Sequence, residues 1–391
     1  MRPTVTSGAS VTDAGPPPIP VFQPVIGVDT IKAVVDALHA GWLGMGAVTQ
    51  AFEEGIARFL GLDGRYALAT NTGTSALHLG LLAAGVGPGD EVITPAFNFV
   101  ADHQAIVTTG GTPVLCDVDD TALGLDPDKV AALIGPRTKA ILPLHFGGVV
   151  GRVKELFALA EHHRLRIVED ATHAFGTRVD GRAIGSFGDV TCFSFDPVKV
   201  ITSIDGGAVV VGDAAALEQL RHWRFLGIDR ETLARYQNSR AWEYDVVSQG
   251  FRYHMTNINA AVGLSQLTRV EEFMASRRQA CRLYNRLLAG VADVRCPATD
   301  FEDVSPFFYT VRVPAGRREG LIGHLRQRGI ATGIHFLPAQ DFTFLKTCRR
   351  GDLNVTERVT REIMTLPLHT HMPAATVERV VAAIREFLGG A

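Results

Sequence analysis

The stretch KAILPLHFGGVVGRVKELFALAEHHRLRIVED, residues 139–170, joins two apolar runs through a segment with helical periodicity. The runs KAILPLHF and RIVED are short and aliphatic, as strands buried on both faces of a sheet are. Between them, residues 153–164 gather their apolar side chains on one stripe, made of Val153, Leu156, Phe157, Leu159 and Ala160. This pattern predicts a strand, a crossover helix and a second, parallel strand.

The same alternation extends over residues 61–213. Four further apolar runs occur there: EVITPA, TPVLCDVD, VTCFSF and GAVVV. Helical segments separate most of these runs, which is typical of a mainly parallel sheet flanked by helices on both faces. The sequence therefore predicts an α/β fold.

A polar stretch, residues 229–249, follows the predicted sheet and precedes a long helical pattern over residues 256–288. The remaining chain mixes strand and helix patterns, in FFYTVRV, REGLIGHLRQRG and ATVERVVAAIREFL. We expect a flexible N-terminal arm over residues 1–24 and a large domain over 25–255. A linking helix and a smaller α+β C-terminal domain are expected over 256–391.

Composition excludes several classes of function. The chain has 391 residues and a net charge of −3, with Lys and Arg scattered, so we expect no nucleic-acid partner. Five cysteines without a CxxC pair predict neither a disulfide framework nor a zinc site, and no other metal is expected; a reducing cytoplasm fits this usage. No apolar run approaches the roughly 20 residues of a membrane helix, so no membrane association is expected.

Lys199 is one of only six lysines and lies in SFDPVKVITSIDGGAVVV, between two strand-like runs. Most lysines lie on solvated helix faces. A lysine held in a turn at a strand end is partly desolvated, which lowers its pKa and makes the neutral amine available for a Schiff base. The alternative is an ordinary lysine on a surface turn.

Asp170 ends the run RIVED, and His173 follows in ATHAFGT. Ligands of open parallel sheets bind at the carboxyl ends of the strands, so this carboxylate is expected in the site. A carboxylate beside a pyridine nitrogen keeps that nitrogen protonated. The alternatives are a helix N-cap for Asp170 and a packed core histidine for His173.

A phosphate site is predicted in ATNTGTSALHLGLLAAG, where the backbone N–H groups of a helix N-terminus can face an anion. The proposed contacts are Gly73, Thr74 and Ser75, although such residues also serve as routine caps. In EVITPAFNFVA, an aromatic ring at the strand end can stack on a planar cofactor. We favour Phe99 over Phe97 for this role; either could belong to the core.

Together these segments resemble the nucleotide-sugar aminotransferases of the DegT and StrS type, which are fold-type I enzymes dependent on pyridoxal phosphate. The resemblance covers nearly the whole chain. It is carried by the order and spacing of GWLGMG, NTGTSALHL, GDEVITPAFNFVA, VEDATHAFGT, GSFGDVTCFSFDPVK, DGGAVV and FRYHMTNINAAVGLSQL.

The resemblance implies pyridoxal phosphate as the cofactor and gives its residues roles. Lys199 looks like the lysine that holds the cofactor, Asp170 like the partner of the pyridine nitrogen, and His173 like the residue near the ring hydroxyl. Phe99 looks like the stacking aromatic. Gly73, Thr74 and Ser194 look like the residues that bind the cofactor phosphate.

Two positions depart from the family pattern. Arg252, in FRYHM, stands where many members carry an Asn that reaches the cofactor phosphate of the neighbouring subunit; arginine can also grip a phosphate. The resemblance therefore implies a homodimer with shared active sites. Asp205 replaces the more usual Glu of an EGG segment, and its function is left open.

The resemblance implies amino transfer from an amino acid, L-glutamate, to a nucleotide-linked keto sugar. The FRYHMTNINAA segment looks like that of the C4 enzymes, which favours a dTDP- or UDP-linked 4-keto-6-deoxyhexose as acceptor and a 4-amino-4,6-dideoxy sugar nucleotide as product. Amination at C3 of a 3-keto sugar is the alternative.

Three other functions compete with this interpretation. A nicotinamide oxidoreductase is suggested by HFGGVVGRVKELF, but Gly147, Gly148 and Gly151 do not form GxGxxG. A non-catalytic regulator that binds pyridoxal phosphate shares the fold, although Lys199 and Asp170 together argue against it. A sugar dehydratase of the same family is expected to carry histidine in place of Lys199.

Overall fold

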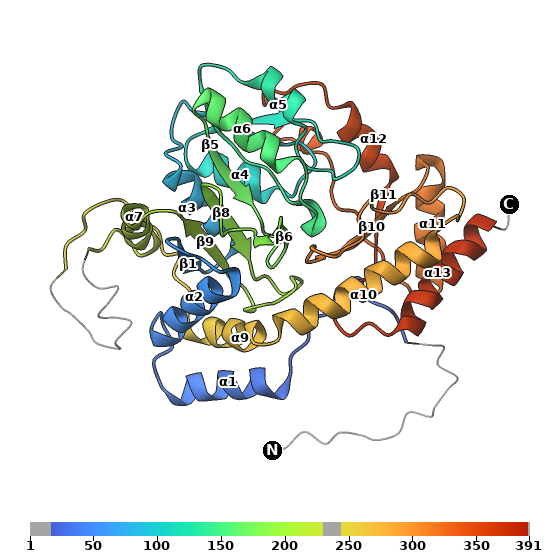
Figure 1. Cartoon of the computed structure of the whole chain (residues 1–391), viewed down its shortest axis with the longest axis horizontal. Helices are drawn as coiled ribbons and strands as arrows, with labels where there is room; N and C mark the ends of the chain where they lie inside the picture. Colours follow the sequence, from blue (N-terminus) through green and yellow to red (C-terminus); the bar gives the residue numbers. More distant parts are fainter. Residues whose placement is uncertain (1–16, 230–243, 390–391) are drawn as a thin grey trace.

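The computed structural model describes residues 17–229 and 244–389. Its central sheet has seven strands, named here in their order across the sheet: β1 (Tyr66–Thr70), β9 (Gly207–Val211), β8 (Val190–Ser194), β5 (Arg166–Asp170), β4 (Thr138–Ile141), β2 (Glu91–Pro95) and β3 (Thr112–Cys116) (Figure 1). Only the two pairings of β9, with β1 and β8, are antiparallel in this sheet. The predicted mainly parallel α/β fold is confirmed.

Helices cover both faces of the sheet. One face is packed by α3 (Gly73–Ala83), α4 (Ala101–Thr108) and α7 (Ala214–Arg224). The other face is packed by α2 (Ala47–Leu60), α5 (Pro127–Leu133), α6 (Val153–His163) and α9 (Asn257–Leu267). Neighbouring residues of β5 divide between the faces, because Ile167 belongs to the core under α6 and Val168 to the core under α3. The strands are therefore apolar on both sides, as their sequence predicts.

A second core lies beside the sheet (Figure 1). It is built by α10 (Val270–Leu288), β10 (Tyr309–Arg312), α11 (Ala315–Gln327), β11 (Ile363–Leu366) and α13 (Ala374–Gly389). Helix α12 (Asn354–Glu362) precedes β11 and packs Val359 in a separate cluster with Phe146 and Phe307. The helical pattern of residues 256–288 is two helices, α9 and α10, separated at Thr268 and Arg269. Phe273 of α10 packs in the core between the sheet and helices α2 and α9, whereas Tyr284 packs in the second core. Helix α10 therefore connects the two cores.

Residues 17–24 pack on the second core. The Ile19 N–H donates to the Gly329 carbonyl at 2.8 Å, and the Leu368 N–H donates to the Val21 carbonyl at 3.0 Å. This part of the expected flexible arm is therefore held in place, whereas residues 1–16 lie outside the described residues. Most of the polar stretch 229–249 also lies outside them, and the division at residue 255 stays a prediction.

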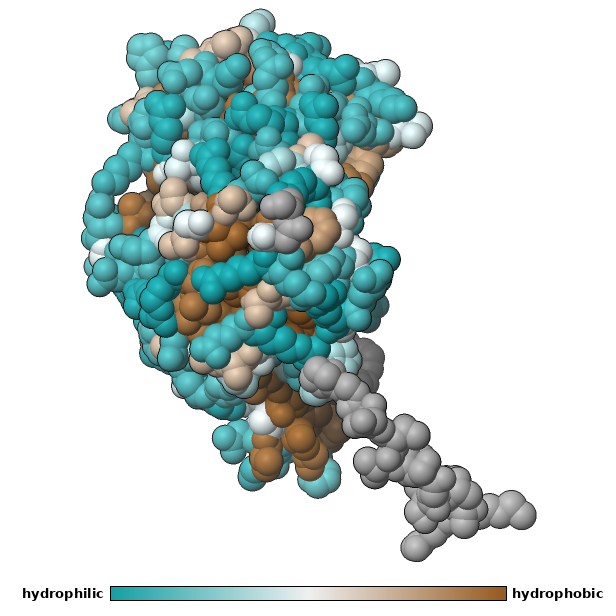
Figure 2. Space-filling model, turned by 90° about the vertical axis from the view of Figure 1, so that its right-hand side faces the viewer, coloured by the Kyte–Doolittle hydropathy of each residue, from teal (hydrophilic) through white to brown (hydrophobic). Residues whose placement is uncertain are grey.

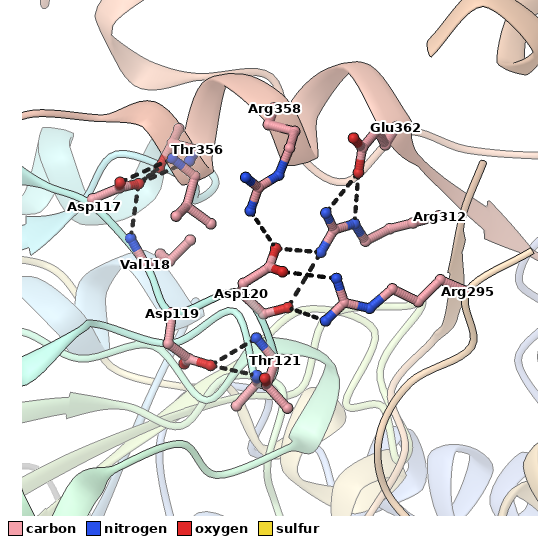
Figure 3. A network of polar contacts seen from close by, with 12 residues as sticks. Asp117, Val118, Asp119, Asp120, Thr121, Arg295, Arg312, Thr356, Arg358 and Glu362 are labelled. Carbon is pink, nitrogen blue, oxygen red and sulfur yellow. Dashed lines mark hydrogen bonds and ion pairs between the residues drawn. The ribbon is translucent and has the colours of Figure 1, made fainter. Parts of the chain in front are cut away.

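An ion cluster joins the loop after β3 to the second core (Figure 3). The Asp120 carboxylate pairs with Arg295 at 2.7 Å, Arg312 at 2.5 Å and Arg358 at 2.8 Å. Nearby, the Asp117 carboxylate accepts hydrogen bonds from the backbone N–H groups of Val355 and Thr356 at the start of α12. Since these contacts are charge-assisted, they fix the second core against the sheet.

Candidate active site

A cavity of about 590 Å³ lies where β2, β5 and β8 end. Asp170 and Ser194 line it as the last residues of β5 and β8, and Gly73 lines it at the start of α3. The segments before β10 and after α11 contribute Phe307 and His335 to its wall. This is the edge of a parallel sheet at which ligands bind.

A slightly larger cavity, of about 690 Å³, lies on the other side of Phe146 and Phe308. Its walls include Asp120 and Arg312 of the ion cluster. Those two charges already pair with each other, and the described residues around this cavity include no amine as deeply buried as that of Lys199. We place the candidate active site in the cavity that contains Lys199.

Lys199 lies in the turn between β8 and β9. The turn is closed by hydrogen bonds from the Phe195 N–H to the Gly206 carbonyl, at 2.8 Å, and from the Ser203 N–H to the Phe195 carbonyl, at 2.9 Å. Gly206 is required there, because a Cβ would lie 2.1 Å from the Ser203 hydroxyl.

The Lys199 amine points into the cavity, with Nζ 4.1 Å from the centroid of the Phe307 ring. Burial lowers the pKa of Lys199 to about 8, although the charges of Asp170 and Asp196 oppose this shift. Roughly a tenth of the amine is therefore neutral at pH 7, far more than for an ordinary lysine, which favours a nucleophile and general base.

Asp170 is 3% exposed, and its carboxylate accepts a hydrogen bond from the Thr172 N–H at 2.9 Å. No helix follows β5 between residues 171 and 177, a fully described stretch, so the N-cap interpretation of Asp170 is wrong. The bond to Thr172 is the local Asx turn instead.

His173 is buried and packs against Phe307, with ring centroids 4.5 Å apart. Burial, followed by the charges of Lys199, His335 and His145, holds the pKa of His173 well below its usual value. The Gly147 N–H points at Nδ1 from 3.4 Å, which assigns Nδ1 as acceptor and leaves Nε2 to carry the proton.

The glycines that suggested a dinucleotide site serve close packing. Gly147 and Gly148 have φ values of 65° and 94°. A Cβ on Gly148 would lie 2.2 Å from the Ser305 carbonyl oxygen and 3.0 Å from that of His173. The pair therefore lets the second core approach the site.

The N-terminus of α3 forms one end of the cavity. Thr72, Gly73, Thr74 and Ser194 line it. Gly73 is required, because a Cβ would lie 2.7 Å from the Ser194 Cβ. The backbone N–H groups of this first turn favour an anion such as a phosphate.

Ser75 and Arg252 were also predicted to contact the phosphate, Arg252 that of the neighbouring subunit. The Ser75 N–H donates to Thr72 Oγ1 at 2.9 Å and the Ser75 hydroxyl donates to Asn71 or the Thr72 carbonyl, so Ser75 serves the helix cap. Arg252 is exposed. Within residues 17–229 and 244–389, neither residue lines the cavity of its own chain.

Phe99 is 57% exposed and lines the cavity, whereas Phe97 is fully buried. The Phe99 ring lies 6.0 Å from that of Phe336, and its backbone N–H donates to Asn98 Oδ1 at 2.6 Å. Phe99 is therefore available to stack on a ligand and Phe97 is a core residue.

Several cavity residues were not predicted: Phe22, Asp102, Phe307, His335 and Phe336. Asp102 is 1% exposed at the start of α4, where a carboxyl among apolar residues in NFVADHQAI is the available sequence signal. The aromatic residues come from distant segments, and Phe22 and Phe307 stack with centroids 5.4 Å apart. Asp205 also lines the cavity.

These residues fit pyridoxal phosphate. An amine that deprotonates near neutral pH suits its aldehyde, a buried carboxylate suits its pyridine nitrogen, and the α3 N-terminus suits its phosphate. In the described part of the chain, no three His, Cys, Asp or Glu side chains are placed to hold a metal ion. Its helices include none long and apolar enough to cross a membrane.

Comparison with known families agrees with this geometry. Residues 24–385 match the DegT/DnrJ/EryC1/StrS aminotransferase family, whose members depend on pyridoxal phosphate. The resemblance that the sequence motifs indicated is thus confirmed, and with it the cofactor.

Solved structures give the same result. The aminotransferase TlmJ from Streptoalloteichus hindustanus is 35% identical, with a TM-score of 0.88 over 95% of this chain and 99% of that one. S. venezuelae DesV is 32% identical, with a TM-score of 0.87 over 95% and 99% of the two chains. Spr1654 from Streptococcus pneumoniae, described as a candidate sugar aminotransferase, is 28% identical in its PLP-form, with a TM-score of 0.87 over 95% and 99%.

Proposed function

The chain belongs to the DegT/DnrJ/EryC1/StrS aminotransferase family, and we propose that it transfers an amino group to a nucleotide-linked keto sugar with pyridoxal phosphate held on Lys199. One observation carries this proposal. A single cavity brings together an amine with a pKa near 8 and the buried carboxylate of Asp170. Amino transfer needs both groups, the amine to move the proton and the carboxylate to keep the pyridine nitrogen protonated.

Bound pyridoxal phosphate supplies an electron sink for the carbon that gains or loses the amino group. Lys199 moves the proton at that carbon, because its amine exchanges protons near neutral pH. Asp170 holds the pyridine nitrogen protonated, and His173 can donate from Nε2 to the ring hydroxyl. Gly73, Thr74 and Ser194 hold the phosphate.

The amino donor is proposed to be L-glutamate and the acceptor a dTDP- or UDP-linked 4-keto-6-deoxyhexose, which gives a 4-amino-4,6-dideoxy sugar nucleotide. The FRYHMTNINAA segment supports C4 over the alternative, C3 of a 3-keto sugar. The apolar rings of Phe22 and Phe336 along the cavity support a sugar that lacks one hydroxyl.

The test offers the purified protein L-glutamate and a panel of nucleotide-linked 3-keto and 4-keto sugars, with products identified by NMR. We expect an amine at C4 and none with Lys199→Ala. Amination only at C3 would show that the acceptor is a 3-keto sugar, while the proposed amino transfer would still hold. Bound cofactor with no turnover on any sugar would favour the non-catalytic regulator.

We also propose a homodimer in which each site takes Arg252 from the partner. Helix α1 (Val28–His39) turns apolar residues outward: Val28, Ile31, Val35 and Leu38 are between 41% and 80% exposed. Figure 2 shows this hydrophobic patch at the lower end of the molecule, where α1 lies in Figure 1. Such a face is suited to burial against a second copy.

The five free cysteines support a cytoplasmic location.

A further inference from the structure

Asp102 and Asp170 bury two carboxyl groups in the wall of the same cavity. Asp102 is 1% exposed and Asp170 3% exposed, and both line the cavity. Asp102 Oδ2 accepts a hydrogen bond from Asn98 Nδ2 at 2.6 Å. Its other oxygen, Oδ1, is buried and receives no hydrogen bond among the residues that the structure describes.

Besides Asn98, the side chain within hydrogen-bonding reach of Asp102 is the carboxyl of Asp170. Two ionised carboxylates in contact repel each other strongly in a dry site, so one proton must lie between them. With that proton on Asp102 Oδ1, the unpaired atom becomes a donor and Asp170 the acceptor. Both carboxyls are then satisfied.

The surroundings decide which carboxyl carries the proton. Asp170 already accepts a hydrogen bond from the Thr172 N–H at 2.9 Å, whereas Asp102 Oδ1 has no donor among the described residues. Burial, followed by the charge of Asp170, holds the pKa of Asp102 well above its usual value.

Among residues 17–229 and 244–389, no cation acts on Asp102 from the elements packed on it. Cys192 on β8 donates to the Ala76 carbonyl and its pKa is raised by burial, so it is a neutral thiol. On α4 itself, burial lowers the pKa of His103 to about 4, so it too is neutral. The α4 N-terminus favours an anion only weakly.

We propose that Asp102 is a neutral carboxylic acid that donates its proton to the Asp170 carboxylate and so positions that carboxylate toward the cofactor nitrogen. The first half concerns this chain alone, and the second rests on the proposed function. Asp102 is thus a positioning residue that acts through Asp170. An acid that remains neutral adds a donor to the site without adding a charge.

Two substitutions separate this role from a structural one. Asp102→Asn preserves both hydrogen bonds, because the amide oxygen can accept from Asn98 and the amide N–H can donate to Asp170. Asp102→Leu has a similar volume and no donor. If Asp102 is neutral, Asp102→Asn should match the parent in cofactor affinity and in the titration of the cofactor absorbance, and Asp102→Leu should not.

The first measurement is difference infrared spectroscopy of the cofactor-free protein at pH 7. We expect a protonated-carboxyl band in the parent that is absent in Asp102→Asn. Absence of this band in the parent would overturn the inference. Since no substrate or cofactor is present, the result is independent of whether the protein aminates sugars.

The second measurement is the affinity for pyridoxal phosphate and the pH titration of its visible absorbance. We expect Asp102→Asn to bind within about twofold of the parent with the same titration midpoint, and Asp102→Leu to bind roughly tenfold more weakly, the usual effect of losing one hydrogen bond to a charged group. A shifted midpoint in Asp102→Asn would mean that a charge had been removed, and would refute the neutral acid. Tight binding by Asp102→Leu would refute the positioning role. If Asp102→Leu does not fold, the infrared band of the parent and the titration midpoint of Asp102→Asn still test the proposal.

Discussion

Replacing Lys199 by methionine is expected to stabilise the cofactor-free protein while abolishing its activity. Burial moves the pKa of Lys199 from its ordinary 10.5 to about 8. Each unit corresponds to about 1.4 kcal/mol, so the ionised amine destabilises the folded state by roughly 3 kcal/mol at pH 7. The Phe307 ring, 4.1 Å from Nζ, offsets about 0.5–2 kcal/mol through its cation–π interaction. A net gain of about 1–3 kcal/mol is expected in Lys199→Met.

The sign of the pH dependence follows from the direction of the shift. Between pH 8 and 10.5 the unfolded chain binds more protons at this lysine than the folded one, so the stability of the parent rises with pH in this window. Methionine does not titrate and keeps an apolar contact with Phe307. The advantage of Lys199→Met should therefore be largest at pH 7 and fall to about half by pH 9.5.

Urea denaturation of the cofactor-free proteins at pH 7 and pH 9.5 measures this difference. Lys346→Met is the matched control, because Lys346 is exposed and its replacement should change stability by less than about 0.5 kcal/mol. A Lys199→Met protein less stable than the parent at pH 7 would refute the reasoning. A gain that is the same at both pH values would show that a buried charge is not its cause.

Four further predictions concern the site and its supports. Lys199→Ala should remove the visible absorbance band and all transamination while circular dichroism is unchanged; ordinary turnover would dismiss the lysine assignment. Asp170→Asn should still bind cofactor but lower kcat by orders of magnitude. A kcat equal to that of the parent would limit the role of Asp170 to its hydrogen bond with the Thr172 N–H. Asp120→Asn should lower the free energy of unfolding in urea at pH 7 by about 1–2 kcal/mol after allowance for solvent screening, because, against the opposing effect of burial, three arginines lower the pKa of Asp120. The difference should begin to shrink as pH falls below 4 and disappear only once Asp120 is itself protonated in the folded protein; Asp180→Asn, at an isolated exposed pair, is the control. Mixing Lys199→Ala with an inactive Arg252 variant should restore activity in heterodimers, and no recovery after verified subunit exchange would count against shared sites.

The sequence was most informative where periodicity and burial agree. The apolar runs marked β2, β3, β5, β8 and β9 to within a few residues, because strands buried on both faces cannot alternate in polarity. Lys199 and Asp170 could be located because the end of a parallel strand fixes the edge of the sheet on which a side chain emerges.

Other features depend on contacts that no local pattern encodes. The break between α9 and α10 falls at Thr268 and Arg269, without Gly or Pro, so periodicity alone reads one helix. Ser75 has the residue type of a phosphate ligand, yet its hydrogen bonds to Asn71 and Thr72 commit it to the helix cap. Phe22 looked like part of a free arm because its partner, Phe307, lies far along the chain.

The active site depends on both cores. The sheet side supplies Lys199 and Asp170, whereas Phe307 comes from the segment directly before β10 of the second core, and its ring lies against the Lys199 amine and the His173 imidazole. Burial by that ring helps to keep the amine deprotonable, so any loosening of the second core would hydrate Lys199 and return its pKa toward 10.5. The Asp120 cluster, which fixes the second core to the loop after β3, therefore supports the chemistry of an amine that it does not touch.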